Sequence, residues 1–411
     1  MVRTYVRHVA SFSDQAKLFL VAELLAGIGH GTFIVLRNLY LRECGLSEGF
    51  IGQAMSISAL GTMVVTVPLA FFMGRGGFRA FLVAGALASA LGLVGTALWP
   101  TPVPVLVSSF VAGAGSSLLG VGAGPFYMRN STPVERPFLF AVGTALGPLA
   151  GFVGAGLVWS LARAWGDDAF SHQWMLLAAS AITTVGAVPF LFLRDDASAP
   201  APRVKQEFDR VTAAKLCLPA FVIGLGAGLT IPFINLYFRD RFGLPAERIS
   251  VIFGAAQVVT FFAFLSAPAV ARRLGGVPAI VACQLVSLPF FLVMALTMSP
   301  WLAVAGFLGR HALMNMTGPV QSNFAMEVVP ERQRMLTNSL REVAWSTSWM
   351  LATATGGWMI SHTRFLRDGY TVTMLTTIGL YGVGSLMFWI FWRRSTVLSA
   401  RPSARFGLES E

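Results

Sequence analysis

The sequence predicts an all-α polytopic membrane protein with twelve transmembrane helices in two pseudo-symmetric six-helix bundles. Of its 411 residues, 55% are hydrophobic and only 12% are charged, about half the charged fraction of a soluble domain. The hydrophobic residues fall in blocks of about twenty, which is the length that crosses ~30 Å of hydrocarbon. In addition, the second half of the chain repeats features of the first half.

The hydrophobic blocks define the expected helices in order. The predicted spans are 17–40, 49–73, 80–99, 104–127, 138–162, 173–193, 214–238, 249–271, 278–298, 301–326, 337–360 and 370–392. Between the sixth and seventh spans lies the longest polar interruption, RDDASAPAPRVKQEFDRV. We therefore expect an N-terminal bundle (1–193), a cytoplasmic linker (194–213), a C-terminal bundle (214–392) and a cytoplasmic tail (393–411).

Basic residues are distributed unequally between the two sides of this topology. With the amino terminus inside, twenty arginines and lysines fall in inner segments and seven in outer segments. This positive-inside bias predicts that both termini are cytoplasmic. The same placement accounts for the net charge of +11, so we expect no nucleic acid as a partner. The expected partners are the lipid bilayer and a small-molecule substrate. The excess of arginine over lysine indicates a bacterial source, and for such a source we expect the inner (plasma) membrane. We also expect the protein to be a monomer.

The two halves share a sequence motif near the end of their first helix. Residues 27–46 align with 224–244, with one insertion. The matching positions are Gly27, Gly29, Gly31, Asn38, Leu39, Tyr40 and Arg42 with Gly224, Gly226, Gly228, Asn235, Leu236, Tyr237 and Arg239. Duplication of a six-helix unit is typical of secondary transporters, whose substrate site lies between the repeats near the bilayer midplane.

Two motifs carry a resemblance to a known family. The loop AFFMGRGGFRAFL, 70–82, matches the pattern G-x-x-x-D-R-x-G-R-K at Arg75, Gly77, Arg79 and Leu82, with Gly74 at the position of the aspartate. With six plus six helices and a charged central loop, the chain resembles the major facilitator superfamily over essentially its whole length. The resemblance implies that the first, fourth, seventh and tenth helices line a central cavity.

The second motif is GTALGPLAG in the fifth predicted span. It is similar to the G-x-x-x-G-P-x-x-G-G motif of proton-coupled antiporters in this family. Gly143, Gly147 and Gly151 recur every four residues and form a ridge that a neighbouring backbone can approach, and Pro148 bends the helix. Plain helix packing is the alternative. Ser109 aligns with the arginine of drug–proton antiporters, so the direction of transport stays open.

Ionisable residues inside the predicted spans mark the expected site, because charges in a bilayer are costly unless they face water or one another. Helical periodicity places Glu23, His30 and Arg37 on one face of the first helix and gives the tenth helix a polar wedge around Arg310. The expected cavity residues are Glu23, His30, Arg37, Arg310, His311, Asn315, Gln321, Glu342, Trp345 and Trp349. As alternatives, Arg310 forms a structural ion pair with Glu23 or Glu342, and the histidines and tryptophans only pack.

These residues predict a secondary transporter that works by alternating access and exports a small amphipathic or drug-like molecule. Glu23, His30, His311 or Glu342 would couple transport to the proton gradient, with Arg310 switching proton affinity between states. Proton-coupled uptake of an organic solute, lipid or lysolipid transport, and a receptor or assembly factor on a transporter scaffold are the alternatives. No nucleophile–base set, H-E-x-x-H pair or phosphate loop is present, so we expect no enzyme, metal or cofactor.

Overall fold

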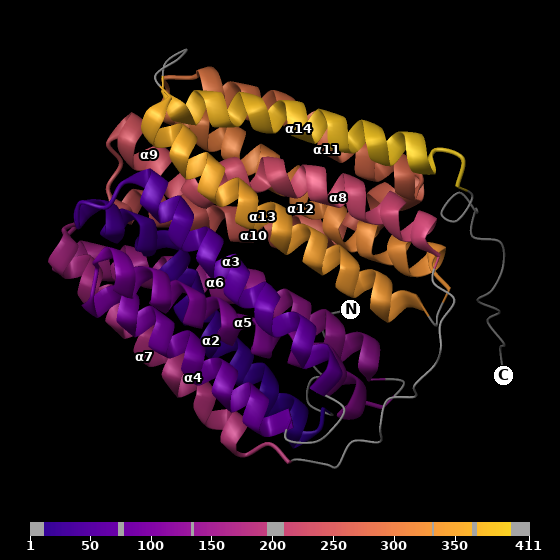
Figure 1. Cartoon of the computed structure of the whole chain (residues 1–411), viewed down its shortest axis with the longest axis horizontal. Coiled ribbons are helices and arrows are strands. Elements are labelled where there is room, and N and C mark those ends of the chain that lie inside the picture. Colours follow the sequence, from indigo (N-terminus) through magenta and orange to yellow (C-terminus); the bar gives the residue numbers. More distant parts are fainter. Residues whose placement is uncertain are drawn as a thin grey trace.

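The computed structural model describes residues 12–72, 78–132, 135–194, 209–330, 333–363 and 368–395, and these residues are almost entirely helical (Figure 1). The first bundle contains α2 (Asp14–Glu43), α3 (Glu48–Phe72), α4 (Phe78–Leu98), α5 (Pro102–Arg129), α6 (Arg136–Trp165) and α7 (Ala169–Leu191). The second contains α8 (Arg210–Thr230), η1 (Ile231–Phe233), α9 (Ile234–Phe242), α10 (Ala246–Leu274), α11 (Gly276–Leu296), α12 (Pro300–Val328), α13 (Arg334–His362) and α14 (Gly369–Trp392).

The twelve predicted spans correspond in order to these helices, which confirms the predicted fold class. Ten of the described helical segments, counting α8 to α9 as one, are long and apolar enough to cross a membrane. The helices of the tenth and eleventh predicted spans, α12 and α13, have 29 residues each but are not among these ten segments. The seventh predicted span is interrupted: α8 ends at Thr230, and a short 3₁₀ turn containing Pro232 precedes α9. Proline lacks the amide hydrogen that a continuous helix needs there.

Both bundles have a linker end, where α7 ends and α8 begins, and an opposite end, where α2 and α9 end. The two bundles approach each other at the left of Figure 1, which is the opposite end, and their helices diverge toward the linker end at the right. Most of the predicted linker 194–213 and tail 393–411 lies outside the described residues. The described chain resumes at Asp209, whose carboxylate caps the start of α8.

The internal duplication is visible in hydrogen bonds as well as in sequence. The hydroxyl of Tyr40 donates to the Ala97 carbonyl at the end of α4, at 2.7 Å. The matching Tyr237 donates to the Met294 carbonyl near the end of α11, also at 2.7 Å. Each repeat therefore uses the same tyrosine to fix its first helix to its third.

A reciprocal amide contact, which we call the asparagine clasp, joins the bundles near the opposite end. Asn38 donates to the Pro232 carbonyl at 2.7 Å, and the matching Asn235 donates to the Val35 carbonyl at 2.9 Å. The two side-chain amides also contact each other at 3.3 Å. Both asparagines are buried, so each hydrogen bond satisfies groups that would be costly to leave unpaired.

Close backbone packing between α3 and α13 reinforces this contact. A β-carbon added at Gly52 would lie 3.1 Å from the Gly357 Cα, and one added at Gly357 would lie 3.0 Å from the Gly52 Cα. The related crossing of α6 on α10 is looser, because a β-carbon at Gly254 would meet Ala155 Cβ at 3.6 Å. Small residues thus let the bundles approach closely on one side of the interface.

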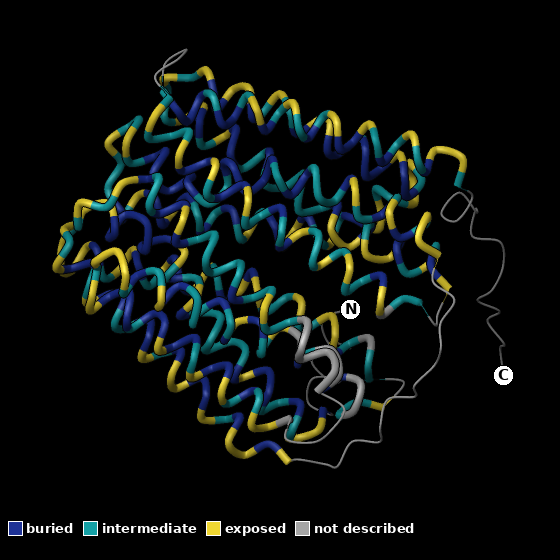
Figure 2. Tube along the Cα trace, viewed as in Figure 1, coloured by how far each residue is buried: buried dark blue, intermediate teal, exposed yellow. Residues whose placement is uncertain are grey.

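Many large apolar side chains lie on the outside of both bundles, where exposed residues are yellow in Figure 2. Trp301 is 81% exposed, and Val103 and Phe170 are exposed to a similar degree. An exposed apolar exterior over this much of the surface is expected of a protein whose solvent is lipid.

We predict that Gly52→Ala weakens the contact between the bundles at the opposite end. The added methyl group collides with the α13 backbone, whereas the same group in Gly254→Ala meets only ordinary contacts. Spin labels replacing Trp165 and Met298, in a background without the native cysteines, should report a longer or broader distance distribution in Gly52→Ala. The Gly254→Ala control should match the parent, and indistinguishable distributions in both variants would contradict the prediction.

Candidate functional site

The first bundle encloses a cavity of about 380 Å³, to which all six of its helices contribute. Its walls are mainly apolar and include Phe19, Phe33 and Phe190. Glu23 and His30 of α2 bring ionisable groups into it. Two of the predicted cavity residues therefore share one cavity.

Glu23 is held by a neighbour from another helix. The Tyr127 hydroxyl of α5 donates a hydrogen bond to the Glu23 carboxylate. The Tyr127 ring lies against Gly143 of α6, where an added β-carbon would contact the ring. Among the described residues, no arginine or lysine forms an ion pair with Glu23. The carboxylate is thus positioned by an uncharged partner and remains available to a proton or a cationic group in the cavity.

His30 lies midway along α2, and its side chain is exposed to the cavity rather than packed in the core. It has no hydrogen-bond partner among the described residues. A histidine that is free of protein partners and faces a cavity can exchange protons or contact a ligand.

Arg37 does not line this cavity, contrary to the sequence prediction. Its guanidinium is buried, donates to the Ser109 hydroxyl at 2.7 Å, and lies 5.7 Å from the centre of the Phe33 ring. Ser109 is the residue that aligns with the antiporter arginine. An arginine from the first helix therefore occupies the neighbourhood of that position.

Arg310 was predicted to line a cavity shared by the two bundles or, alternatively, to form an ion pair with Glu23 or Glu342. The structure shows neither arrangement among the described residues. Arg310 is buried within the second bundle, where it donates to the Tyr381 hydroxyl of α14 at 2.6 Å. Its guanidinium lies 4.9 Å from the centre of the Phe291 ring. A hydroxyl and aromatic faces therefore stabilise this charge.

The neighbours of Arg310 on α12 make contacts within their own helix. His311 packs on the Phe307 ring at 5.3 Å, and Asn315 donates to the His311 carbonyl at 2.8 Å. These contacts fit the packing alternative for His311. Among the described residues, no hydrogen bond or ion pair joins the ionisable groups of the first helix to those of the tenth.

A second cavity of about 440 Å³ lies inside the second bundle, between α8, α12, α13 and α14. Gln321, Glu342 and Trp345 line it together with Arg341. The sequence prediction placed the first three in one cavity shared with Glu23. Trp349 stacks on Trp345 at 5.9 Å, with the rings inclined by 30°.

The motif residues have mixed positions. Arg75 and Gly77 lie outside the described residues, and Arg79 is exposed. Gly147 faces open space and lines the first cavity, while Gly151 lies against the α2 backbone at Gly31 and the Gln257 side chain. Pro148 is inside α6. The glycine ridge therefore serves both helix packing and the cavity.

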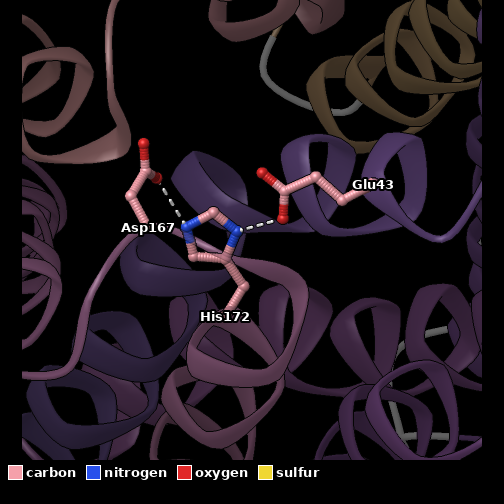
Figure 3. A group of neighbouring side chains, drawn as sticks. All are labelled: Glu43, Asp167 and His172. Atoms are coloured by element: carbon pink, nitrogen blue, oxygen red, sulfur yellow. Dashed lines mark hydrogen bonds and ion pairs between the residues drawn. The ribbon is translucent and has the colours of Figure 1, made fainter.

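Sequence reasoning missed an ion-pair network at the opposite end, formed by Glu43, Asp167, His172 and Arg239. The fully buried His172 ring lies between two carboxylates, with Nδ1 2.7 Å from Glu43 and Nε2 3.0 Å from Asp167 (Figure 3). A carboxylate only accepts, so both contacts are satisfied when both ring nitrogens carry protons. Three of these groups belong to the first bundle.

Arg239 connects this network to the second bundle. Its guanidinium contacts Glu43 and Asp167, each at 2.6 Å. The Ala246 amide also donates to Asp167 at 3.2 Å. Arg239 duplicates Arg42, which instead pairs with Glu48 of its own bundle at 2.9 Å. The presence of Arg239 in the duplicated motif was the feature of the sequence that could have indicated this interface role.

The network perturbs Asp167, which lies in the connection between α6 and α7. Burial alone would raise the pKa of this carboxyl group. Hydrogen bonds from His172, Arg239 and the Ala246 amide, together with the charge of Arg239, outweigh burial and hold its pKa well below the usual range. The ionised form is thus the one that the closed interface stabilises.

Glu43, Asp167 and His172 each offer one ligand atom within 4.8 Å of the others. However, the carboxylates approach opposite nitrogens of the ring, and Arg239 already contacts both (Figure 3). The arrangement is therefore that of an ion-pair network and not of a formed coordination shell.

Comparison with known proteins identifies the family. The sequence profile of the Major Facilitator Superfamily matches residues 19–309 and 216–409. The chain belongs to the Major Facilitator Superfamily. This superfamily is one of membrane transporters, and the two bundles have its fold.

Solved structures of the superfamily resemble the chain over almost its whole length. The nucleoside transporter NupG has a TM-score of 0.70 and 14% identity, covering 93% of this chain and 100% of NupG. A D-xylose–proton symporter has a TM-score of 0.74 and 15% identity, covering 94% and 98%. A bacterial homologue of the human lysosomal transporter Spinster has a TM-score of 0.74 and 13% identity, covering 92% and 96%.

Among curated proteins, the multidrug resistance protein MdtH of Shigella flexneri serotype 5b (strain 8401) is 24% identical over 147 residues. The match covers 36% of this chain and 37% of MdtH. MdtH of Shigella sonnei (strain Ss046) matches over the same length at 23% identity. The chain therefore matches little more than a third of these relatives.

We predict that Asp167→Asn destabilises the closed interface by roughly 1–3 kcal/mol, the usual range for charged hydrogen bonds. A carboxyl with a lowered pKa stabilises fully above its ordinary pKa and loses this effect only as pH falls through the lowered value. The loss of thermal stability in Asp167→Asn should therefore be present at both pH 5 and pH 8, since Asp167 itself stays ionised across this range.

Asp168→Asn is the matched control, because Asp168 is exposed and accepts from the Ser171 amide as the α7 cap, which asparagine can also do. Equal melting temperatures of the two variants would argue against the Asp167 network.

Proposed function

We propose that this protein is a proton-coupled secondary transporter that exports a small amphipathic molecule by alternating access. It would act as a monomer in a bacterial inner membrane, with both termini in the cytoplasm. The observation that carries the proposal is Glu23, a carboxylate without a basic ion-pair partner among the described residues, inside an otherwise apolar membrane cavity.

The position of Glu23 supports its role as the proton carrier. An ionised carboxylate in such surroundings needs a counter-charge, and Tyr127 supplies only a hydrogen bond. A proton or a cationic group entering the cavity provides the missing charge. A carboxylate that binds a proton loses its negative charge and binds a cationic group more weakly. Binding of the proton therefore favours release of the cationic group, and the reverse, which is the exchange that antiport requires. His30 lies in the same cavity and offers a second site for the proton.

This scheme replaces the one in which Arg310 moves toward the carboxylate. Arg310 is committed to Tyr381 and Phe291 within its own bundle. The coupling group and its partner would instead lie in the first bundle, and coupling to the second bundle would run through the substrate and the bundle interface.

The interface supports alternating access between two states. The asparagine clasp and the Arg239 network hold the bundles together at the opposite end, while the helices diverge at the linker end. With a cytoplasmic linker, this arrangement corresponds to an inward-facing state. Separation of the clasp and approach of the linker ends would produce the outward-facing state.

Two observations favour export over uptake. About a third of the chain is similar to MdtH, which is a multidrug resistance protein. The α6 glycine–proline motif is also similar to that of proton-coupled antiporters, and its Gly147 lines the cavity that contains Glu23.

The experiment uses protein reconstituted into liposomes that contain a trapped pH-sensitive dye. A panel of amphipathic cations, anions and zwitterions is added, and substrate-dependent proton movement is recorded. At least one compound should drive proton movement by the parent protein. Glu23→Gln should reduce this rate at least tenfold while retaining the fold, because glutamine keeps the shape but cannot exchange a proton.

The control is Glu327→Gln, which changes an exposed acid near the end of α12 and should retain the full rate. Uncoupled but rapid substrate flux in the parent protein would contradict proton coupling. Coupled movement that drives substrate inward under the physiological proton gradient would contradict export.

A further inference from the structure

The cavity in the second bundle contains two charged groups of opposite sign that do not pair with each other. Arg341 and Glu342 are adjacent on α13 and both line the cavity. Neither forms a hydrogen bond or an ion pair with any side chain in the part of the chain that the structure describes. Consecutive helical residues point about 100° apart, so the two groups face different parts of the cavity.

Three arginines whose side chains are buried within the helices have protein partners. Arg37 donates to Ser109, Arg310 to Tyr381, and Arg241 to Asp368. Arg341 has none among the described residues, although its side chain is half-buried. An ionised guanidinium in a membrane protein is stabilised by water, by a protein partner or by a ligand. Because Arg341 lines a cavity, a ligand in that cavity can contact its guanidinium.

The surroundings of the two charges are suited to a polar group with an apolar extension. Asn338 and Gln321 add amide donors beside Arg341, and Ser322 adds a hydroxyl. The remaining wall is apolar or aromatic, and it includes the Trp345 ring. A ligand here would meet a donor-rich side, a carboxylate and an apolar wall in one cavity.

The corresponding cavity of the first bundle has different chemistry. In the duplicated alignment Glu23 corresponds to Ala220, and Ala220 lines the second cavity. The two repeats have therefore kept cavities at related places while distributing their charges over different helices. The second cavity has both a cationic and an anionic group, whereas Glu23 is the acidic group of the first.

We propose that Arg341 and Glu342, with Asn338 and Gln321, form a binding site for the zwitterionic headgroup of an amphipathic ligand. Arg341 and the amides bind its oxyanion, and Glu342 binds its ammonium group. The apolar part of the ligand lies against Trp345 and the adjoining wall. This inference deepens the proposed function, on which it rests for the transported species, but binding can be measured without transport.

The test uses the full chain in nanodiscs of phosphatidylglycerol, whose headgroup has no amine. The probes are decylphosphocholine, decyl phosphate, decyltrimethylammonium and decyl maltoside, which share one chain and are used below their critical micelle concentrations. Titration should show decylphosphocholine binding at least tenfold more tightly than decyl maltoside. The two probes that carry charge of only one sign should lie between them.

The variants give a charge-specific pattern that general unfolding does not produce. Arg341→Gln should weaken decylphosphocholine and decyl phosphate about tenfold or more and leave decyltrimethylammonium unchanged. Glu342→Gln should weaken decylphosphocholine and decyltrimethylammonium and leave decyl phosphate unchanged. Arg341→Lys should retain part of the affinity, and Arg272→Gln, an exposed arginine of α10, should retain all of it.

Repeating the titration in phosphatidylcholine nanodiscs distinguishes the source of the ligand. A lower apparent affinity there shows that bilayer lipid occupies the site, and an unchanged affinity shows that only single-chain amphiphiles enter it. The proposal is overturned if Arg341→Gln binds decylphosphocholine like the parent, or if the parent does not prefer it to decyl maltoside. The proposed function is judged separately, because Glu23→Gln should reduce coupled proton movement at least tenfold while retaining decylphosphocholine binding.

Discussion

The asparagine clasp is the contact on which the described arrangement of the two bundles depends. A bilayer supplies no hydrophobic driving force between helices, so two bundles associate through close packing and hydrogen bonds. Asn38 and Asn235 supply these hydrogen bonds reciprocally, and Gly52 and Gly357 allow the close packing beside them. Since the clasp lies near one end only, the bundles are held there and diverge at the other end.

Much of the fold could be predicted from the sequence because the bilayer restricts what a chain can do. Hydrophobic length fixed the number and order of helices, and the duplicated motif indicated equivalent halves. Tyr40 and Tyr237 make the same hydrogen bond in the two repeats, which follows from their shared sequence. The interruption at Pro232 was the principal departure, since a hydropathy window averages over a single 3₁₀ turn.

The site was less predictable, and Arg310 shows the physical reason. Helical periodicity gives the relative directions of side chains on one helix, but it does not tell which neighbour that face meets. The partner of Arg310 is Tyr381, which lies 71 positions further along the chain. Glu23 and His30 were found because their face does meet a cavity. The Asp167 network was missed because its residues lie at helix ends, where charge looks like ordinary surface.

In the alternating-access mechanism that we propose, the distribution of the Asp167 network between the bundles would influence how readily the protein changes state. Glu43, Asp167 and His172 all move with the first bundle, so departure of Arg239 leaves both carboxylates beside the imidazole ring. Opening at this end would remove only the charge of Arg239 and leave the two carboxylates with one protonated ring, so part of the charge compensation would persist, which limits the energy difference between the two conformations. A two-state equilibrium with a small gap is the kind that the modest binding energy of a small ligand or a single proton can redirect.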